Sequence, residues 1–178
     1  YRDIILTQPI KALSEERFYD LKNQGIDVGI ETGDNKYNDG ARVKVVTQEI
    51  FYEKYSKNNN DTVIIDEIHY IFSNQERSRA YLESIYNMNK NTKLILMSAT
   101  ISKPNSFIKY LNNLTNRDIK LVEWNNRCVP LEYVIDKEYK LNSKDLHNSI
   151  VFGFTVKTLE ILSNEYVMKS KPVNKHTI

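Results

Sequence analysis

The sequence has one cysteine, a nearly balanced charge and no long apolar run. A single cysteine, Cys128, excludes an internal disulfide framework and fits a reducing compartment, so we expect a cytoplasmic location, or a nuclear one in a eukaryote. No run of 18 apolar residues occurs, which predicts that no segment spans a membrane. Lys and Arg number 25 against 23 Asp and Glu, so any basic surface for a nucleic-acid partner must be local.

The pattern G-x-x-x-x-G-K-[ST] is also absent from the sequence, so these residues contain no phosphate-binding loop of that type. What is present is typical of a folded globular protein, because 40% of the residues are apolar and 27% are charged. A length of 178 residues is enough for one complete hydrophobic core and part of a second domain.

Short apolar runs alternate with amphipathic segments over most of the chain. The runs predict strands, and the segments between them predict helices with one apolar side. The expected strands are 4–7, 26–30, 43–46, 62–66, 93–97 and 119–122. The expected helices follow Pro9, span 48–55 and 75–89, and begin again at Pro104, with a loop at 31–40. This alternation predicts an α/β fold with a mostly parallel sheet flanked by helices.

The alternation changes after Pro130. Residues 136–148 are polar and charged, which is typical of a linker, and Ile150–Phe154 begins a new apolar run that predicts a strand. We therefore expect three parts in the chain: a first domain at 1–135, a linker at 136–149 and the beginning of a second domain at 150–178.

An acidic pair, Asp66 and Glu67, stands at the carboxyl end of the expected strand at 62–66. Ligands collect in the crevice at the carboxyl ends of parallel strands, so both carboxylates are expected to face such a crevice. One carboxylate there can hold Mg²⁺, directly or through water, while the other orients or deprotonates a water molecule. The alternative is a strand that ends in a solvated acidic turn.

A second polar group, Ser98-Ala99-Thr100, follows the strand at 93–97. Both strand ends belong to the same crevice in a parallel sheet, so the two hydroxyls could reach the carboxylates or His69. The alternative is that Ser98 or Thr100 caps the next helix, since Ser and Thr are common N-cap residues.

Together, these elements resemble motifs II and III of superfamily-two helicases, with Asp66–His69 as the DExH box and Ser98–Thr100 as the Ser-Ala-Thr motif. Three further segments look like nucleic-acid-contacting motifs, in the family's order: Pro9–Ser14, Thr32–Asp34 and Val46–Ile50. The likeness narrows to the Ski-type RNA helicases that feed the RNA exosome, through residues 69–71, 75–77, 98–101 and 126–132. It covers nearly all of residues 1–135.

The resemblance implies a RecA-like first domain, the start of a second RecA-like domain, and the use of ATP and Mg²⁺. Asp66 would hold Mg²⁺ on the phosphates of ATP. Glu67 would act on the attacking water and contact Mg²⁺ through water, and His69 would connect the nucleotide site to the second domain. Ser98, Ala99 and Thr100 would couple hydrolysis to strand movement. The family's Gly-Lys-Thr loop would precede residue 1.

The resemblance also assigns seven nucleic-acid-binding residues, which are Pro9, Lys11, Thr32, Gly33, Asp34, Thr47 and Glu49. Each group lies where a strand passes into a helix or loop, and free backbone N–H groups at such junctions bind phosphate. Contacts of this kind read the backbone, so little sequence specificity is expected. One departure falls here, because Gln48 stands where the family usually has a second threonine.

We therefore expect the core of an ATP-dependent nucleic-acid helicase that moves along single strands, with RNA as the expected substrate, within a larger RNA-processing complex. Two alternatives remain open on the sequence. The first is a DNA helicase or translocase of the same superfamily, because no motif marks the groups that recognise a 2′-hydroxyl. The second is a catalytically dead RNA-binding scaffold in which Asp66 and Glu67 are a remnant.

Overall fold

The computed structural model describes residues 3–124, together with 155–157, 160–161 and 163–164. The chain divides into two units at residue 124, and the fold below is that of the first unit. The predicted linker at 136–149, almost all of the predicted second domain and the segment Asn126–Glu132 lie outside the described residues. Among the described helices, none is long and apolar enough to cross a membrane.

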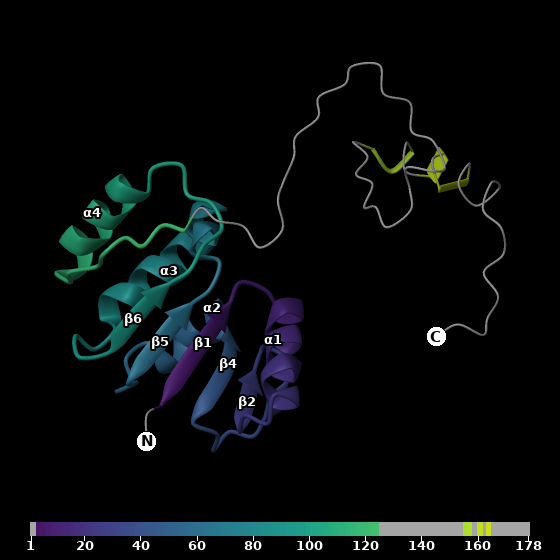
Figure 1. The fold of residues 1–178 in the computed structure, drawn as a ribbon, viewed down its shortest axis with the longest axis horizontal. Coiled ribbons are helices and arrows are strands. Elements are labelled where there is room, and N and C mark those ends of the chain that lie inside the picture. The colour runs from purple at the N-terminus through teal and green to yellow at the C-terminus, as the bar shows by residue number, and fades with distance from the viewer. Residues whose placement is uncertain (1–2, 125–154, 158–159, 162, 165–178) are drawn as a thin grey trace. The chain divides into compact units, whose positions relative to one another are not determined.

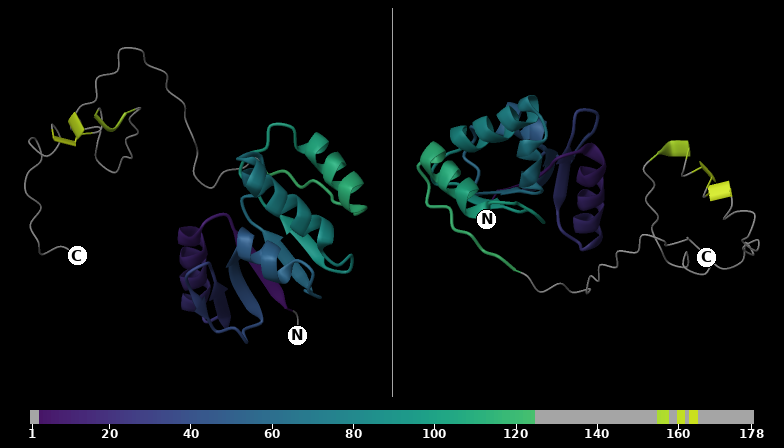
Figure 2. Two further views of the ribbon diagram at one scale, coloured as in Figure 1. Left: turned by 180° about the vertical axis from the view of Figure 1, so that it is seen from behind. Right: turned by 90° about the horizontal axis from the view of Figure 1, so that it is seen from above.

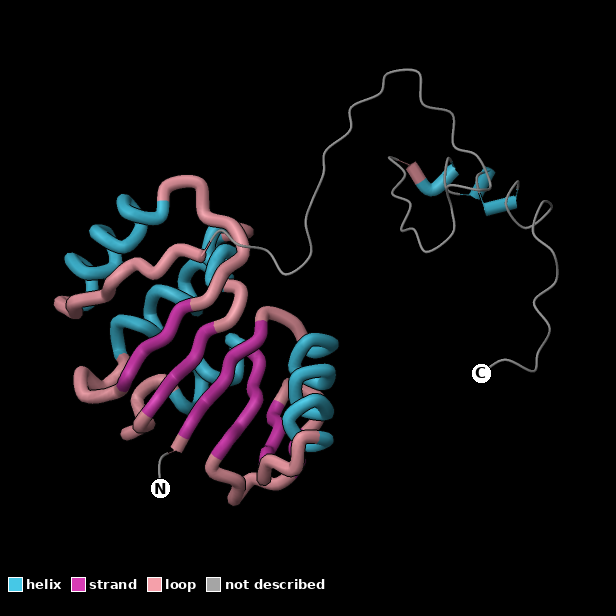
Figure 3. The backbone as a smooth tube through the Cα atoms, in the orientation of Figure 1, coloured by secondary structure: helices cyan, strands magenta, loops and turns pink. Residues whose placement is uncertain are grey.

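The first unit is built on a six-stranded sheet with the strand order β3-β2-β4-β1-β5-β6 (Figures 1 and 3). Its strands are β1 (Ile4–Gln8), β2 (Val28–Glu31), β3 (Lys36–Tyr37), β4 (Val43–Thr47), β5 (Thr62–Ile65) and β6 (Lys93–Leu96). Every neighbouring pair is parallel except β2 and β3. The predicted mostly parallel α/β sheet is therefore confirmed.

Six helical segments accompany the strands of the first unit, five of them between strands and α4 after the last strand. They are α1 (Lys11–Asn23), α2 (Gln48–Ile50), the π-helical turn η1 (Phe51–Tyr55), the 3₁₀ turn η2 (Ile68–Phe72), α3 (Gln75–Asn87) and α4 (Pro104–Thr115). The predicted helix at 48–55 thus forms as a short α-helix that continues into a π-helical turn. The turn η2, directly after the acidic pair, was not predicted.

Two local predictions are wrong. Part of the expected loop at 31–40 forms β3, which pairs antiparallel with β2 and places Tyr37 opposite Ile30. The expected strand at 119–122 does not form. The backbone of Ile119 instead exchanges two hydrogen bonds with the side chain of Asn112 on α4, at 2.8 and 3.2 Å. A side-chain amide has taken the place of a neighbouring strand there.

The sheet is covered on both faces, as a parallel sheet requires. Helix α1 packs on one face, and α2, η1, η2 and α3 pack on the other (Figures 1 and 2). The core on the α1 face consists of Leu6, Phe18, Val28, Ile30 and Val45. The larger core on the opposite face includes Val46, Phe51, Val63, Ile65, Tyr81 and Ile85. Alternate residues of one strand thus supply both cores.

Candidate functional site

Five loops leave the carboxyl ends of the parallel strands and line one edge of the sheet. The strand order fixes the spatial order of these loops along that edge, which is 32–34, 47–49, 9–11, 66–69 and 97–100. The three predicted nucleic-acid loops therefore follow three adjacent strands, β2, β4 and β1. The DExH and Ser-Ala-Thr segments follow the next two strands, β5 and β6. The edge therefore has a predicted nucleic-acid half and a half that carries the DExH and Ser-Ala-Thr segments, called the chemical half below, and the two halves meet between β1 and β5.

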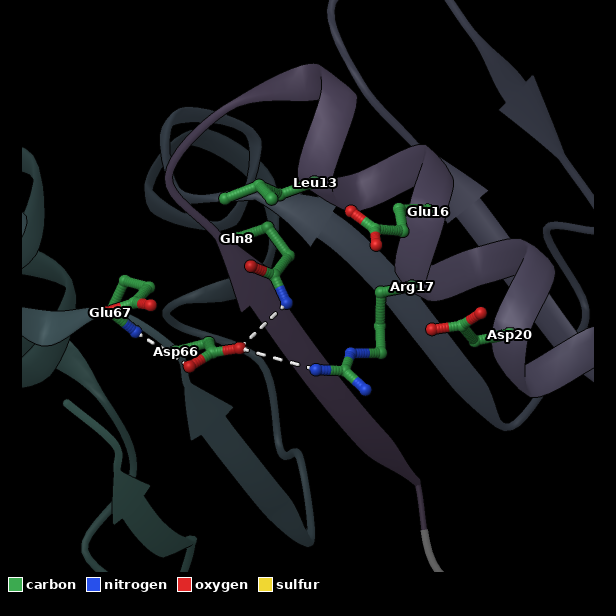
Figure 4. Close-up of a pocket in the computed structure, with 7 residues that line it drawn as sticks. All are labelled: Gln8, Leu13, Glu16, Arg17, Asp20, Asp66 and Glu67. Carbon is green, nitrogen blue, oxygen red and sulfur yellow. Dashed lines mark hydrogen bonds and ion pairs between the residues drawn. The ribbon is translucent and has the colours of Figure 1, made fainter. Parts of the chain in front are cut away.

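Asp66 lies at this meeting point and is held by several donors (Figure 4). Its backbone N–H donates to the carbonyl of Thr7 at 3.1 Å, which extends the pairing of β5 with β1. Its Oδ1 accepts the N–H of Glu67 at 2.9 Å, and its Oδ2 accepts Nε2 of Gln8 at 3.0 Å. Nη2 of Arg17 lies 3.9 Å from the same Oδ2. The carboxylate is thereby fixed in orientation and largely buried.

Glu67 has a left-handed backbone, with φ 50° and ψ 47°. A non-glycine residue in that region costs about 1–3 kcal/mol, and such residues cluster at functional sites. Hydrogen bonds on both sides hold the turn, since Ile68 N donates to the Met97 carbonyl at 2.9 Å and Tyr70 N to the Glu67 carbonyl at 3.0 Å. The turn separates the side chain of Glu67 from that of Asp66, so the two carboxylates point in different directions (Figure 4).

His69 brings the loop at 66–69 into contact with the loop at 97–100. Its Nδ1 lies 3.0 Å from Oε2 of Glu67 and 3.2 Å from Oγ of Ser98. Ser98 Oγ also donates to the Thr100 carbonyl at 3.4 Å. The predicted proximity of Ser98 to His69 is therefore confirmed. The capping alternative for this loop is wrong, because α4 begins only at Pro104 and its N-cap residue is Lys103.

Asp66 and Glu67 supply the oxygen ligands that a hard cation such as Mg²⁺ prefers, but two carboxylates alone do not complete its shell. Glu67 Oε2 is buried and accepts no hydrogen bond from any described residue, although His69 lies within ion-pair distance. A buried acceptor without a donor costs free energy, and a water molecule or cation would satisfy it. No group of three or more His, Cys, Asp or Glu residues in the described part of the chain could hold a metal alone. Two carboxylates suffice for Mg²⁺ only when substrate phosphates and water complete its shell.

The seven predicted nucleic-acid residues divide into buried and exposed sets. Pro9, Thr32 and Thr47 are buried. The hydroxyl of Thr32 accepts the N–H of Asn35 at 3.1 Å, and that of Thr47 accepts the N–H of Ile50 at 3.5 Å. Buried hydroxyls used in this way shape their own loops, and their contact with nucleic acid remains a prediction.

The exposed set consists of Lys11, Gly33, Asp34 and Glu49. Nζ of Lys11 forms a salt bridge with Asp34, and its side chain lies over Gly33, where an added Cβ would meet Lys11 Cε at 3.6 Å. The loops at 9–11 and 32–34 therefore touch through Lys11. Glu49 lies 4.0 Å from Nε of Arg77 on α3.

Gln48, the departure from the family pattern, is fully buried and bridges two elements. Its Oε1 accepts the hydroxyl of Thr7 at 2.8 Å, and its Nε2 donates to Oγ of Ser84 at 2.9 Å. A threonine could not span both partners, so the substitution links β1 to α3 in this chain. Unlike Gln48, the residues Gln8, Arg17 and Glu31 were not singled out from the sequence. Each is polar and lies near a strand end or on the first helix, but only the strand register brings it to the site.

Glu31 is a buried carboxylate at the end of β2, directly before the loop at 32–34. Its two carboxylate oxygens accept hydrogen bonds from Nζ of Lys54 and from the hydroxyl of Tyr55 on η1, both at 2.5 Å. Nζ of Lys36 lies 3.8 Å from Oε2. Burial by itself raises the pKa of Glu31, but the hydrogen bonds and charges of Lys54 and its neighbours outweigh burial and lower that pKa. The same contact raises the pKa of Lys54. The cluster ties the loop at 32–34 to the helix that follows 47–49.

The variant Glu31→Gln is expected to lower the free energy of unfolding by about 1–3 kcal/mol at neutral pH, because hydrogen bonds to a charged group are lost. Because the pKa of Glu31 is lower in the folded state, its carboxylate stabilises the fold at pH values above 4.5, the ordinary pKa of Glu. This stabilisation is lost as the pH falls through the folded pKa. The difference between wild type and variant should therefore shrink in acid. Urea unfolding across pH 3–8 measures it, with the exposed Glu15→Gln as control. A difference that grows in acid would contradict this account.

Residues 2–107 match the family model described as DEAD/DEAH box helicase. Over 136 residues the chain is 33% identical to human Superkiller complex protein 2, and this alignment covers 74% of this chain and 11% of that protein. Over 137 residues it is 31% identical to the Arabidopsis thaliana DExH-box ATP-dependent RNA helicase DExH9, covering 74% of this chain and 14% of that protein. The crystal structure of the E. coli DExH-box NTPase HrpB superposes with a TM-score of 0.48 at 20% identity, over 61% of this chain and 15% of that one. The chain spans less than a fifth of the length of either curated relative.

Proposed function

Because this chain belongs to the DEAD/DEAH box helicase family, we propose that it is part of an ATP-dependent RNA helicase that moves along a single strand in the 3′ to 5′ direction. One observation carries the proposal: the DExH loop and the three nucleic-acid loops leave adjacent parallel strands and share one edge of the sheet. Nucleotide and nucleic acid would then bind to the same rigid element. A small movement of one loop can reach the other through the strands between them.

In the proposed reaction, Asp66 holds Mg²⁺ and Glu67 acts on the attacking water. When bound, Mg²⁺ neutralises negative charge on the phosphates of ATP. Asp66 suits its role because Gln8 and the N–H of Glu67 already orient its carboxylate. Glu67 suits its role because it directly follows Asp66 and lines the same pocket, and a carboxylate can take a proton from water.

His69 and Ser98 support the proposed coupling between hydrolysis and strand movement. Their contact joins the DExH loop to the loop at 97–100, which also contains Ala99 and Thr100. A change at Glu67 can therefore pass through His69 to the end of β6. We further propose that His69 faces the second RecA-like domain, which would begin near residue 150 after a linker at 136–149.

The proposed nucleic-acid contacts come from Lys11 and from the backbone of the loops at 9–11, 32–34 and 47–49. Such contacts bind phosphate and give little sequence preference. RNA is favoured over DNA because one relative is named as an RNA helicase. Assembly into a larger RNA-processing complex is proposed on the names of the Superkiller complex protein and of the RNA helicase DExH9. A cytoplasmic or, in a eukaryote, nuclear location is proposed on the single cysteine of the sequence.

The intact protein should hydrolyse ATP faster with single-stranded RNA than with DNA of the same sequence, and should unwind RNA duplexes that carry a 3′ overhang. Steady-state ATPase assays with both strands and unwinding assays with 3′ and 5′ overhangs test this. Equal stimulation by DNA would favour the alternative DNA helicase. RNA binding without hydrolysis would favour the alternative of a catalytically dead scaffold.

A further inference from the structure

A pocket of about 210 Å³ lies between α1 and the ends of β1 and β5 (Figure 4). The residues that line it are Gln8, Leu13, Glu16, Arg17, Asp20, Asp66 and Glu67. Four of these side chains are carboxylates, and Arg17 is the single cation among them. The pocket lies where the nucleic-acid half of the sheet edge meets the chemical half, so its side chains can connect the two.

Gln8 makes the most buried of these connections. It is the last residue of β1, it is 2% exposed, and it directly precedes Pro9 at the start of the loop at 9–11. Thr7 pairs with Ile65, so the next residue of each strand brings Gln8 beside Asp66. The donation from Nε2 to Asp66 Oδ2 is a hydrogen bond to a charged acceptor, which is stronger than one between neutral groups.

Arg17 reaches the same oxygen from α1. Its Nη2 lies 3.9 Å from Asp66 Oδ2, and its side chain is about half exposed, so this ion pair alone is weak. Its importance comes from its position. Gln8 precedes the loop at 9–11 and Arg17 follows it, so both ends of the segment 8–17 are attached to one carboxylate oxygen.

We propose that Gln8 and Arg17 are positioning residues that transmit the state of Asp66 to the nucleic-acid loop at 9–11. The inference rests on the proposed function, in which Asp66 faces Mg²⁺. A divalent cation held by Asp66 competes with Gln8 and Arg17 for the lone pairs of its carboxylate, and it repels the positive charge of Arg17. Segment 8–17 then loses one or both attachments and the loop at 9–11 can shift.

Coupling between two binding sites is reciprocal, so nucleotide at Asp66 and RNA at the loop change each other's affinity by the same factor. We expect magnesium-bound nucleotide to tighten RNA binding, because release of Arg17 adds an unpaired positive charge beside the nucleic-acid loops. Couplings of this kind typically amount to about 5–150-fold in affinity. The part carried by Gln8 should disappear when its amide is removed.

The test measures the Kd of the intact protein for a fluorescent single-stranded RNA, with and without Mg²⁺ and a non-hydrolysable ATP analogue. The ratio of the two Kd values is the coupling factor. Gln8→Ala is expected to reduce this factor by about fivefold or more, and Gln24→Ala, the same change at the exposed end of α1, should leave it unchanged. Arg17→Ala is expected to reduce it, whereas Arg17→Lys keeps the charge and should retain part of it.

A wild-type coupling factor that survives in Gln8→Ala and in Arg17→Ala overturns this inference and leaves the proposed function intact. Wild-type protein that binds neither RNA nor the nucleotide analogue overturns both. Thermal melting of each variant separates loss of fold from loss of coupling. Should Gln8→Ala not fold, the exposed Arg17 variants decide the question, since Arg17→Ala with an unchanged factor is sufficient to reject the proposal.

Discussion

Replacement of Glu67 by glutamine is expected to slow ATP hydrolysis in the intact protein by about 10²–10⁴-fold, the usual contribution of a general base. Binding of ATP and RNA should change little, because a group that acts on water in the transition state adds little to ground-state binding. The side chains have the same shape, so the left-handed turn at residue 67 and the contacts of Asp66 are expected to persist. The amide cannot take a proton from water, and the buried Oε2 position loses its charge.

Steady-state ATPase rates and the Kd for ATP and RNA, measured on the same preparation, test this expectation. Glu76→Gln makes the same chemical change at an exposed position in the first turn of α3 and serves as the control. Near-normal turnover in Glu67→Gln would remove Glu67 from the reaction. Loss of ATP binding together with hydrolysis would instead indicate that the residue holds the nucleotide or the fold.

The polypeptide of residues 1–178 by itself is expected to show no measurable ATPase activity and very weak ATP binding. It carries the carboxylates of Asp66 and Glu67, but its sequence contains no G-x-x-x-x-G-K-[ST] loop to hold the phosphates. Carboxylates alone repel a polyphosphate. An arginine finger contributes about 10³–10⁵-fold in rate to phosphoryl transfer, and no motif identified in this sequence supplies one. The lack of a phosphate-binding loop and the lack of an arginine finger both act on the hydrolysis of ATP.

Calorimetry with Mg-ATP and an ATPase assay on the purified polypeptide check this prediction, with the intact protein as the positive control. Micromolar affinity for ATP would show that the nucleotide binds at a different place from the one proposed. RNA affinity of the same polypeptide should be weak and should fall steeply with salt, because its contacts are to phosphates. Affinity that does not depend on salt would contradict the predicted backbone contacts.

The sequence by itself determined the α/β class and which polar residues stand at two of the strand ends. Parallel strands are buried on both faces, so runs such as Thr62–Ile65 are apolar throughout and can be recognised without any partner. Asp66 and Ser98 are polar residues that end such runs, and a strand end is a local feature. The family resemblance rests on the order of these short segments, and the match to the DEAD/DEAH box helicase model confirms it.

Only the tertiary structure decided which strand ends are neighbours. The order β2-β4-β1-β5-β6 places the three predicted nucleic-acid loops together, and the pairing of Thr7 with Ile65 brings Gln8 to Asp66. The tertiary structure also buries Glu31 against η1, and it pairs the backbone of Ile119 with a side chain of α4 instead of with a strand. Apolar periodicity records how deeply each segment is buried, but not which segment lies beside it. That choice depends on packing between residues that are far apart in the chain, and packing exists only in the folded protein.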